Sequence, residues 1–159
     1  IRQRQDILYN VDMKQLSENR KARFDYEILE TFEAGISLTG QEVKSVRKGG
    51  AQITGSFVLV KPDGAQLLNA QIPPYQPNNT DPGYKPDRTR RLLLNKKEIN
   101  YLLNKAKEGG LTIVPLSIYD KGRRMKLAIG LARHKKARDK RETIKRRETD
   151  REVRRTLKY

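Results

Sequence analysis

Basic side chains interleaved with aromatic ones are the residues of this sequence whose types and spacing suggest chemistry. One group contains Arg20, Lys21, Arg23, Phe24 and Tyr26, and a second spans residues 84–91. Arg and Lys bind phosphate groups, whereas aromatic rings stack on unpaired bases. The alternative for the two aromatic rings of the first group is burial in the core as strand residues, and for the second group it is a solvated loop. The two groups predict a surface that binds nucleic acid.

Residue types that catalytic and metal sites need are scarce. The sequence has no cysteine and a single histidine, His134, in a highly charged segment. A zinc site needs several Cys or His ligands, and a nucleophilic triad needs a histidine base that is held in place. A pair such as Asp81 and Asp87 could bind Mg²⁺, but carboxylates on loops are more often only solvated. We therefore expect a protein that is not an enzyme and has no metal site or cofactor.

Net charge indicates the class of partner. The 159 residues include 35 Lys or Arg and 19 Asp or Glu, which gives +16 at pH 7. Such a balance favours a polyanion, either nucleic acid or an anionic membrane surface. No apolar run approaches the roughly 18–20 residues of a membrane span, and no signal-peptide pattern is visible. We therefore expect a cytoplasmic protein that binds nucleic acid and not a membrane.

Apolar periodicity in the first part of the chain predicts strands. Residues 1–18 stay unassigned, and alternation then predicts strand structure over residues 24–38 with a bend at Gly35. A short helix is expected next, followed by a hairpin around the turn Lys61-Pro-Asp-Gly64. Residues 73–89 lack periodicity, and loops of this length are usually functional or disordered.

The second part of the chain adds a helix and a long hairpin. Asn95 and Glu98 predict a capping box at the start of the helix. Residues 111–119 and 124–132 alternate as two strands around a tight turn. The predicted fold class is mainly β with short helices. It is a small oligonucleotide-binding (OB)-type β-barrel, closed or nearly closed, over residues 19–132.

Residues 133–159 have a different composition and form a basic tail. They contain 13 Lys or Arg against 5 Asp or Glu, and few sizeable apolar side chains. Low hydrophobicity with high net charge predicts disorder in isolation. Glu, Lys and Arg are nevertheless good helix formers, and no Pro or Gly interrupts residues 135–159. We expect a tail that is disordered when free and helical against a polyanion.

Five short motifs occur in order along the chain: Asn19-Arg-Lys-Ala, Phe32-Glu-Ala-Gly35, Gly40-Gln-Glu-Val-Lys-Ser45, Asp87-Arg-Thr-Arg-Arg-Leu-Leu-Leu94 and Asp139-Lys-Arg141. In order and spacing they resemble the SsrA-binding protein (small protein B) family. Each motif alone is a weak signal, but five in register are a strong one. The resemblance extends over residues 19–155.

The resemblance implies an RNA-binding adaptor for transfer-messenger RNA (tmRNA) in bacterial trans-translation, the rescue of stalled ribosomes. An OB-type barrel would bind the tRNA-like part of tmRNA. The tail would become helical in the empty mRNA path of the stalled 70S ribosome, near the decoding centre. We expect a monomer.

Residue types and the family resemblance together give the predicted site residues. The RNA-binding set is Arg20, Lys21, Phe24, Glu33, Lys44, Arg47, Arg88, Arg90, Leu93 and Asn95. The ribosome-binding tail set is Arg133, Lys135, Lys136, Arg138, Asp139, Lys140 and Arg141. Matching family positions supply Glu33, Leu93 and Asn95 of the first set and Asp139, Lys140 and Arg141 of the second.

The roles of two of these residues are left open. Asn95 is predicted as a helix cap from its spacing and as an RNA contact from the resemblance, and both hold if the helix N-terminus faces RNA. Arg138 stands where the family commonly has a histidine that stacks at the decoding centre. A guanidinium can also stack on a base, so the role can survive the change.

Two other function classes compete with the adaptor. One is a general barrel for single-stranded nucleic acid, or a ribosome-associated factor, with a basic tail. The other is a metal-dependent nuclease, which is disfavoured because no acidic cluster accompanies the basic groups. Equal affinity for tmRNA, tRNA and a random strand would favour the first, and RNA cleavage with added magnesium would favour the second.

Overall fold

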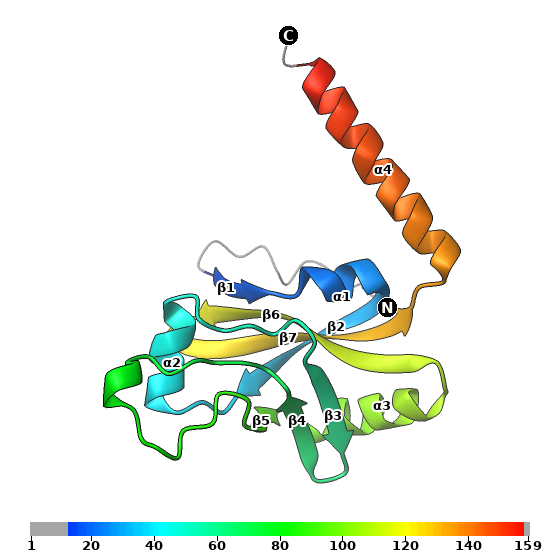
Figure 1. The fold of residues 1–159 in the computed structure, drawn as a ribbon. Coiled ribbons are helices and arrows are strands. Elements are labelled where there is room, and N and C mark those ends of the chain that lie inside the picture. Colours follow the sequence, from blue (N-terminus) through cyan, green and yellow to red (C-terminus); the bar gives the residue numbers. More distant parts are fainter. Residues whose placement is uncertain (1–12, 158–159) are drawn as a thin grey trace.

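One antiparallel sheet of seven strands organises residues 13–157, the part of the chain that the computed structural model describes (Figure 1). The strands are β1 (Lys14–Glu18), β2 (Tyr26–Ile36), β3 (Phe57–Lys61), β4 (Gly64–Leu68), β5 (Arg90–Leu93), β6 (Leu111–Lys121) and β7 (Arg124–His134). The helices are α1 (Arg20–Asp25), α2 (Gly40–Arg47), α3 (Lys96–Lys107) and α4 (Ala137–Thr156), with a short 3₁₀ helix η2 (Pro77–Asn79). The predicted fold class, mainly β with short helices and OB-like, is confirmed.

The spatial order of the strands is β1-β6-β7-β2-β5-β4-β3. The predicted hairpins lie where the turn residues placed them: β6 pairs with β7, and β3 pairs with β4 with Lys61 opposite Gly64. The sheet curls so that β3, at one end of this order, packs near β6. A strongly curled sheet of this kind encloses an apolar core on its inner face, as expected of a small barrel.

Gly35 is the point at which β2 changes partners. It lies opposite Lys126 of β7 and also opposite Leu93 of β5. A Cβ atom on Gly35 would lie 3.1 Å from the Cβ of Leu93, which is tighter than ordinary packing allows. Only glycine lets the two strands approach this closely without displacement of Leu93. The predicted bend is therefore a change of strand partner with a steric cause.

Apolar side chains from the sheet and two helices form the main core. Leu67, Leu127 and Ile129 are fully buried on the inner face of the sheet. Val46 of α2 and Leu102 of α3 enter the same cluster from opposite ends of the sheet (Figure 1). Burial of a Leu or Ile side chain stabilises the fold by roughly 1.5–3 kcal/mol, so the two helices are held by their apolar stripes.

Two segments at the start of the described chain differ from the predictions. Lys14–Glu18, within the unassigned residues, forms β1 on the edge of β6, while residues 1–12 lie outside the described part. Phe24 belongs to α1, so the strand that was predicted from this residue begins only at Tyr26. Asn19 explains the difference, because its buried side chain accepts from the Ala22 N–H at 3.0 Å and caps α1.

The basic tail forms α4, a helix of 20 residues that projects away from the sheet (Figure 1). β7 extends to His134, two residues beyond the predicted end of the barrel. No residue of α4 is buried. Most stability of a protein helix comes from packing, so this helix relies on intrinsic propensity and on its polar contacts with α1. Disorder of the tail when free stays a prediction.

Candidate nucleic-acid interface

Glu33 lies on β2 in a small polar cluster. Its carboxylate accepts hydrogen bonds from the Tyr119 hydroxyl at 2.6 Å and from Lys121 Nζ at 3.0 Å, and Lys126 Nζ lies 3.8 Å away. Burial alone would raise the pKa of Glu33, but these hydrogen bonds and the two lysine charges hold the pKa below its usual value. The same contact with the carboxylate raises the pKa of Tyr119, beyond the effect of burial. Glu33 is thus ionised and positions two lysines on this face.

Leu93 lies beside this cluster as an exposed apolar side chain. It is 58 % exposed and contacts Gly35, which lies two residues from Glu33 on the same face of β2. Strand pairing therefore brings together two residues that the sequence separates by sixty positions. Glu33 and Leu93, both in the predicted RNA-binding set, share one face of the barrel, where an apolar contact adjoins a charged one.

Asn95 caps α3, as its spacing predicted. Its side-chain oxygen accepts from the Glu98 N–H at 2.9 Å, while the Glu98 carboxylate accepts from the Asn95 N–H at 3.2 Å. The cap uses only the oxygen, so the exposed side-chain NH₂ group can still donate to RNA. The cap is confirmed, and the RNA contact stays a prediction.

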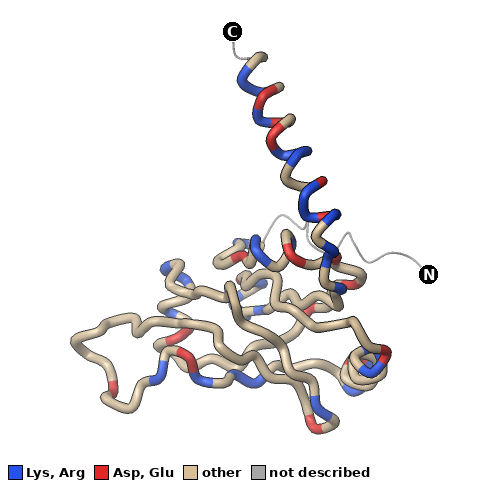
Figure 2. The backbone as a smooth tube through the Cα atoms, turned by 45° about the vertical axis from the view of Figure 1, so that its right-hand side comes forward, with Lys and Arg blue, Asp and Glu red and all other residues tan. Residues whose placement is uncertain are grey.

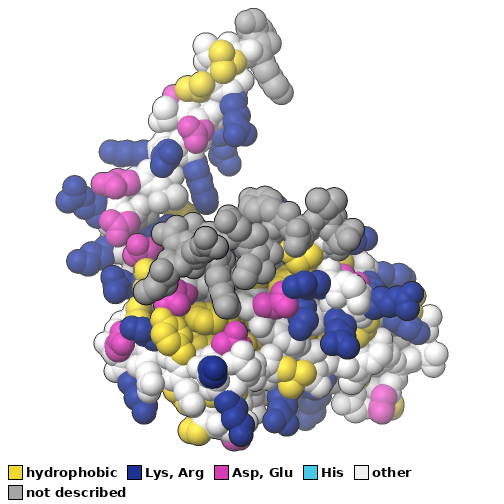
Figure 3. All heavy atoms as spheres, turned by 180° about the vertical axis from the view of Figure 1, so that it is seen from behind, with side chains coloured by type: hydrophobic (Ala, Val, Ile, Leu, Met, Phe, Trp, Pro, Cys, Tyr) yellow, Lys and Arg dark blue, Asp and Glu magenta, His cyan; other side chains and the backbone are white. Residues whose placement is uncertain are grey.

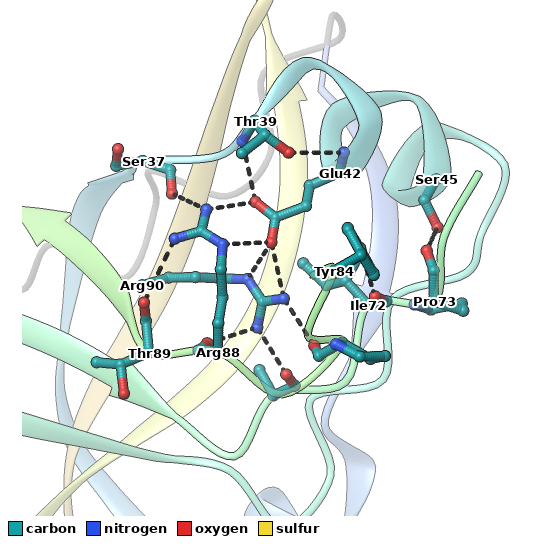
Figure 4. A network of polar contacts seen from close by, with 12 residues as sticks. Ser37, Thr39, Glu42, Ser45, Ile72, Pro73, Tyr84, Arg88, Thr89 and Arg90 are labelled. Carbon is teal, nitrogen blue, oxygen red and sulfur yellow. Dashed lines mark hydrogen bonds and ion pairs between the residues drawn. The ribbon is translucent and has the colours of Figure 1, made fainter. Parts of the chain in front are cut away.

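A buried ion-pair network connects α2 with β5 (Figure 4). The Glu42 carboxylate accepts from Arg88 Nη2 at 2.6 Å, from Arg90 Nε at 3.0 Å and from the Thr39 N–H at 2.9 Å. Burial would raise the pKa of Glu42, but the hydrogen bonds and the Arg90 charge lower it. The carboxylate is therefore ionised and fully paired.

Arg90 is the one predicted RNA-binding residue that the structure contradicts. Its side chain is 0 % exposed, and it also donates to the backbone carbonyls of Ala70 at 2.7 Å and Pro86 at 2.7 Å. The prediction of direct contact was wrong because the guanidinium is used inside the protein to hold the long loop. Arg88 remains 34 % exposed at the edge of the network.

Helix α2 and its C-cap present a further basic group, separate from the two that the sequence predicted. Lys44 and Lys48 lie over the ring of Tyr75 at 5.8 and 4.5 Å from its centroid, and Arg47 pairs with Asp120 at 3.0 Å. Tyr75 belongs to the aperiodic loop, and sequence reasoning did not select it. Only the fold brings this aromatic ring to Lys44 of α2 and to Lys48 at its C-cap.

Helix α1 carries the first basic group of the sequence. Arg20 is 89 % exposed and pairs with Glu18 at 3.1 Å, and Lys21 is also exposed. Phe24 is partly buried, and the guanidinium of Arg147 lies 5.4 Å from its ring centroid. Cation–π contact with the tail therefore occupies at least part of the ring that was predicted to stack on bases.

The tail begins with contacts to α1. Lys140 Nζ donates to Asp25 at 2.9 Å, and this hydrogen bond lowers the pKa of the aspartate. Lys135 Nζ donates to the carbonyl of Arg23 at 3.3 Å. The remaining predicted tail residues are exposed: Arg133, Lys136, Arg138, Asp139 and Arg141. The structure therefore separates the predicted tail set into two residues that anchor the helix and five that face solvent.

Basic side chains recur over the visible surface. Lys and Arg occur along the whole of α4 (Figure 2), and they are also spread over the barrel face seen from behind, between polar and hydrophobic areas (Figure 3). Within residues 13–157, no group of three or more His, Asp or Glu side chains could hold a metal ion. No helix of the described chain is long and apolar enough to cross a membrane.

Comparisons with known proteins agree with this arrangement. The family model described as SmpB protein matches residues 16–159. The SsrA-binding protein of Gloeothece citriformis is 48 % identical over 94 % of this chain and 96 % of its own, and that of Mesoplasma florum is 52 % identical over 89 % and 95 %. A solved structure described as "tmRNA-SmpB: a journey to the center of the bacterial ribosome" matches with a TM-score of 0.65 and 49 % identity over 78 % of this chain and 87 % of that one. The chain belongs to the SmpB family of SsrA-binding proteins.

Proposed function

We propose that this chain is an RNA-binding adaptor that binds the tRNA-like part of tmRNA and delivers it to stalled ribosomes for trans-translation. Membership of the family carries the proposal: relatives that match over nine-tenths of this chain are SsrA-binding proteins. The solved relative is described with tmRNA and the bacterial ribosome. A net charge of +16 suits both of these RNA partners.

In this proposal the barrel binds tmRNA and the tail binds the ribosome. Glu33 and Leu93 supply an ordered lysine pair and an apolar contact, and Asn95 adds a helix N-terminus at the start of α3. Such a mixture suits a folded RNA, which is recognised by shape, by phosphate contacts and by exposed bases. The tail supplies a helix whose exposed side chains are mostly charged.

The proposed role needs no catalysis by the protein itself. The chemistry of tagging belongs to the ribosome, so the adaptor only has to bind and position RNA. We further propose that it acts as a monomer in the cytoplasm, where ribosomes are found.

A proline in the tail helix tests the division between barrel and tail. Thr143 lies inside α4, where its hydroxyl donates to the Asp139 carbonyl at 2.9 Å. Thr143→Pro costs about 3 kcal/mol of helix stability and removes no charge. We expect it to abolish tagging of stalled nascent chains in a reconstituted translation system, while most of the tmRNA affinity is kept.

Thr143→Ala is the matched control. It removes the same hydroxyl but favours the helix, so tagging should persist. Normal tagging by Thr143→Pro would show that the tail acts only as a flexible basic tether. Loss of tmRNA binding in the proline variant would contradict the assignment of that binding to the barrel.

A further inference from the structure

A cleft of about 460 Å³ separates α4 from α1 and the end of β1. Its lining consists of Glu18, Arg20, Arg23, Arg147, Asp150, Arg151 and Arg154. Five arginines thus face two acids in one concave site. Neither the predicted RNA-binding set nor the predicted tail set includes the three arginines of α4.

Guanidinium groups line both sides of the cleft. On one side, Glu18 pairs with Arg20 at 3.1 Å and lies 3.9 Å from Arg23, which restrains both arginines. On the other side, Arg147, Arg151 and Arg154 follow the i, i+4, i+7 spacing and therefore share one face of α4.

Two contacts join α4 to the end of α1. Lys140 pairs with Asp25 at 2.9 Å, and the guanidinium of Arg147 lies 5.4 Å from the Phe24 ring. Beyond these contacts, α4 buries no residue against the barrel. The five arginines exceed the two acids by three positive charges, so an anion between the two sides would be attracted to both.

We propose that the cleft binds a stretch of RNA phosphodiester backbone, which holds α4 against α1. Arginine suits this ligand because its planar fork makes bidentate hydrogen bonds to phosphate. The site has two arginine-bearing sides, and every residue that lines it is charged, which favours a repeating phosphate chain over a peptide. The inference rests on the proposed function only in taking RNA as the partner, and it requires no particular RNA sequence.

Salt dependence of RNA binding tests the α4 side of the cleft. The cleft variant is Arg147→Gln, Arg151→Gln, Arg154→Gln in the full chain. The control variant, Lys145→Gln, Arg146→Gln, Arg155→Gln, removes the same charge from the same helix outside the cleft lining. The probe is a short, unstructured uridine oligonucleotide. Each phosphate contact adds about 0.7 to the slope of log affinity against log salt for single strands, so the cleft variant should lower this slope by about 2.

The control variant should leave the slope within about 0.5 of wild type. Equal losses in the two variants would show that the tail attracts RNA only through its net charge, and no loss in the cleft variant would remove the site altogether. Circular dichroism checks that both variants keep the helix, because glutamine is close to arginine in helix propensity.

Arginine footprinting tests whether both sides hold the same ligand. Phenylglyoxal modifies free guanidinium groups, and mass spectrometry locates the modified residues. We expect the oligonucleotide to protect Arg20 and Arg23 together with Arg147, Arg151 and Arg154. Protection of the α4 arginines alone would contradict a shared ligand. Failure of the protein to prefer tmRNA, with both sides of the cleft still protected, would refute the proposed function but not the cleft.

Discussion

At the scale of single residues, Glu42 matters most for the shape of the interface. Burial of an ionised group costs several kcal/mol unless partners satisfy all of its hydrogen-bonding capacity. Glu42 meets this condition with two arginines and a backbone N–H, and Arg90 meets it with three backbone carbonyls. The network thus ties α2 and the start of β5 to the long loop beside them.

Replacement of Glu42 should therefore destabilise the protein strongly. Glu42→Gln keeps the size of the side chain but leaves the buried charge of Arg90 without its partner. We expect a loss of about 3–5 kcal/mol in unfolding free energy, measured by urea denaturation. Glu18→Gln is the control, since Glu18 also lies near two arginines but is exposed, and it should cost less than about 1 kcal/mol. Equal costs for the two variants would contradict the special role of burial.

An acid titration of the same variants gives an independent check. The pKa of Glu42 is lower in the folded protein than its ordinary value of 4.5. Its contribution to stability is therefore complete above that ordinary value and is lost as the pH falls through the lower folded pKa. Glu33 and Asp25 act in the same direction. Between about pH 6 and pH 3, the wild type should lose more stability than Glu42→Gln.

Residue types alone could not distinguish Arg90 from its neighbours. Three arginines in four positions look alike in the sequence, whether they face solvent or a buried carboxylate 48 positions away. Only strand alternation separates them, because Arg90 and Leu92 point inward while Arg91 and Leu93 point outward. Lys121 and Lys126 were missed for a similar reason, since the register between β2, β7 and β6 creates their contact with Glu33.

At the scale of elements, Asn95 at the start of α3 has two possible roles, as a helix cap and as an RNA contact, and two variants can separate them. Asn95→Ala removes the cap and the NH₂ group together and should cost about 1 kcal/mol of stability. Asn95→Asp keeps an equally good cap but loses the NH₂ donor. Both variants should weaken tmRNA binding if that group contacts RNA. Affinity equal to wild type in Asn95→Asp would show that Asn95 acts only as a cap.

Local sequence signals predicted the elements whose ends are marked by capping or turn residues. The capping box placed the start of α3, and the Pro-Asp-Gly turn placed the β3–β4 hairpin. Helix α1 was missed because six residues are too few to show a helical period. Strand β1 was missed because its pairing with β6 is a non-local contact that five residues of sequence do not encode.

At the scale of the whole molecule, charge is divided between two different structures. The barrel has a packed core and presents lysines and arginines from several strands and helices. The tail carries 13 of the 35 basic residues, and its helix α4 has no buried residue. Composition predicted this contrast, and motif resemblance predicted the family. Neither could predict that α4 and α1 together line a cleft, because that site depends on the angle between the two helices.

Selective binding of tmRNA is the central claim, and one competition experiment tests it most directly. The full chain is titrated with the tRNA-like part of tmRNA, with a tRNA, and with a random single strand of equal length, all at the same physiological salt concentration. Electrostatic attraction alone would treat three RNAs of similar charge alike, so any preference must come from shape and specific contacts. We predict that the tmRNA fragment binds at least about tenfold more tightly than either competitor, a difference of roughly 1.4 kcal/mol. Equal affinity for all three RNAs would contradict the proposal and leave a general RNA-binding barrel.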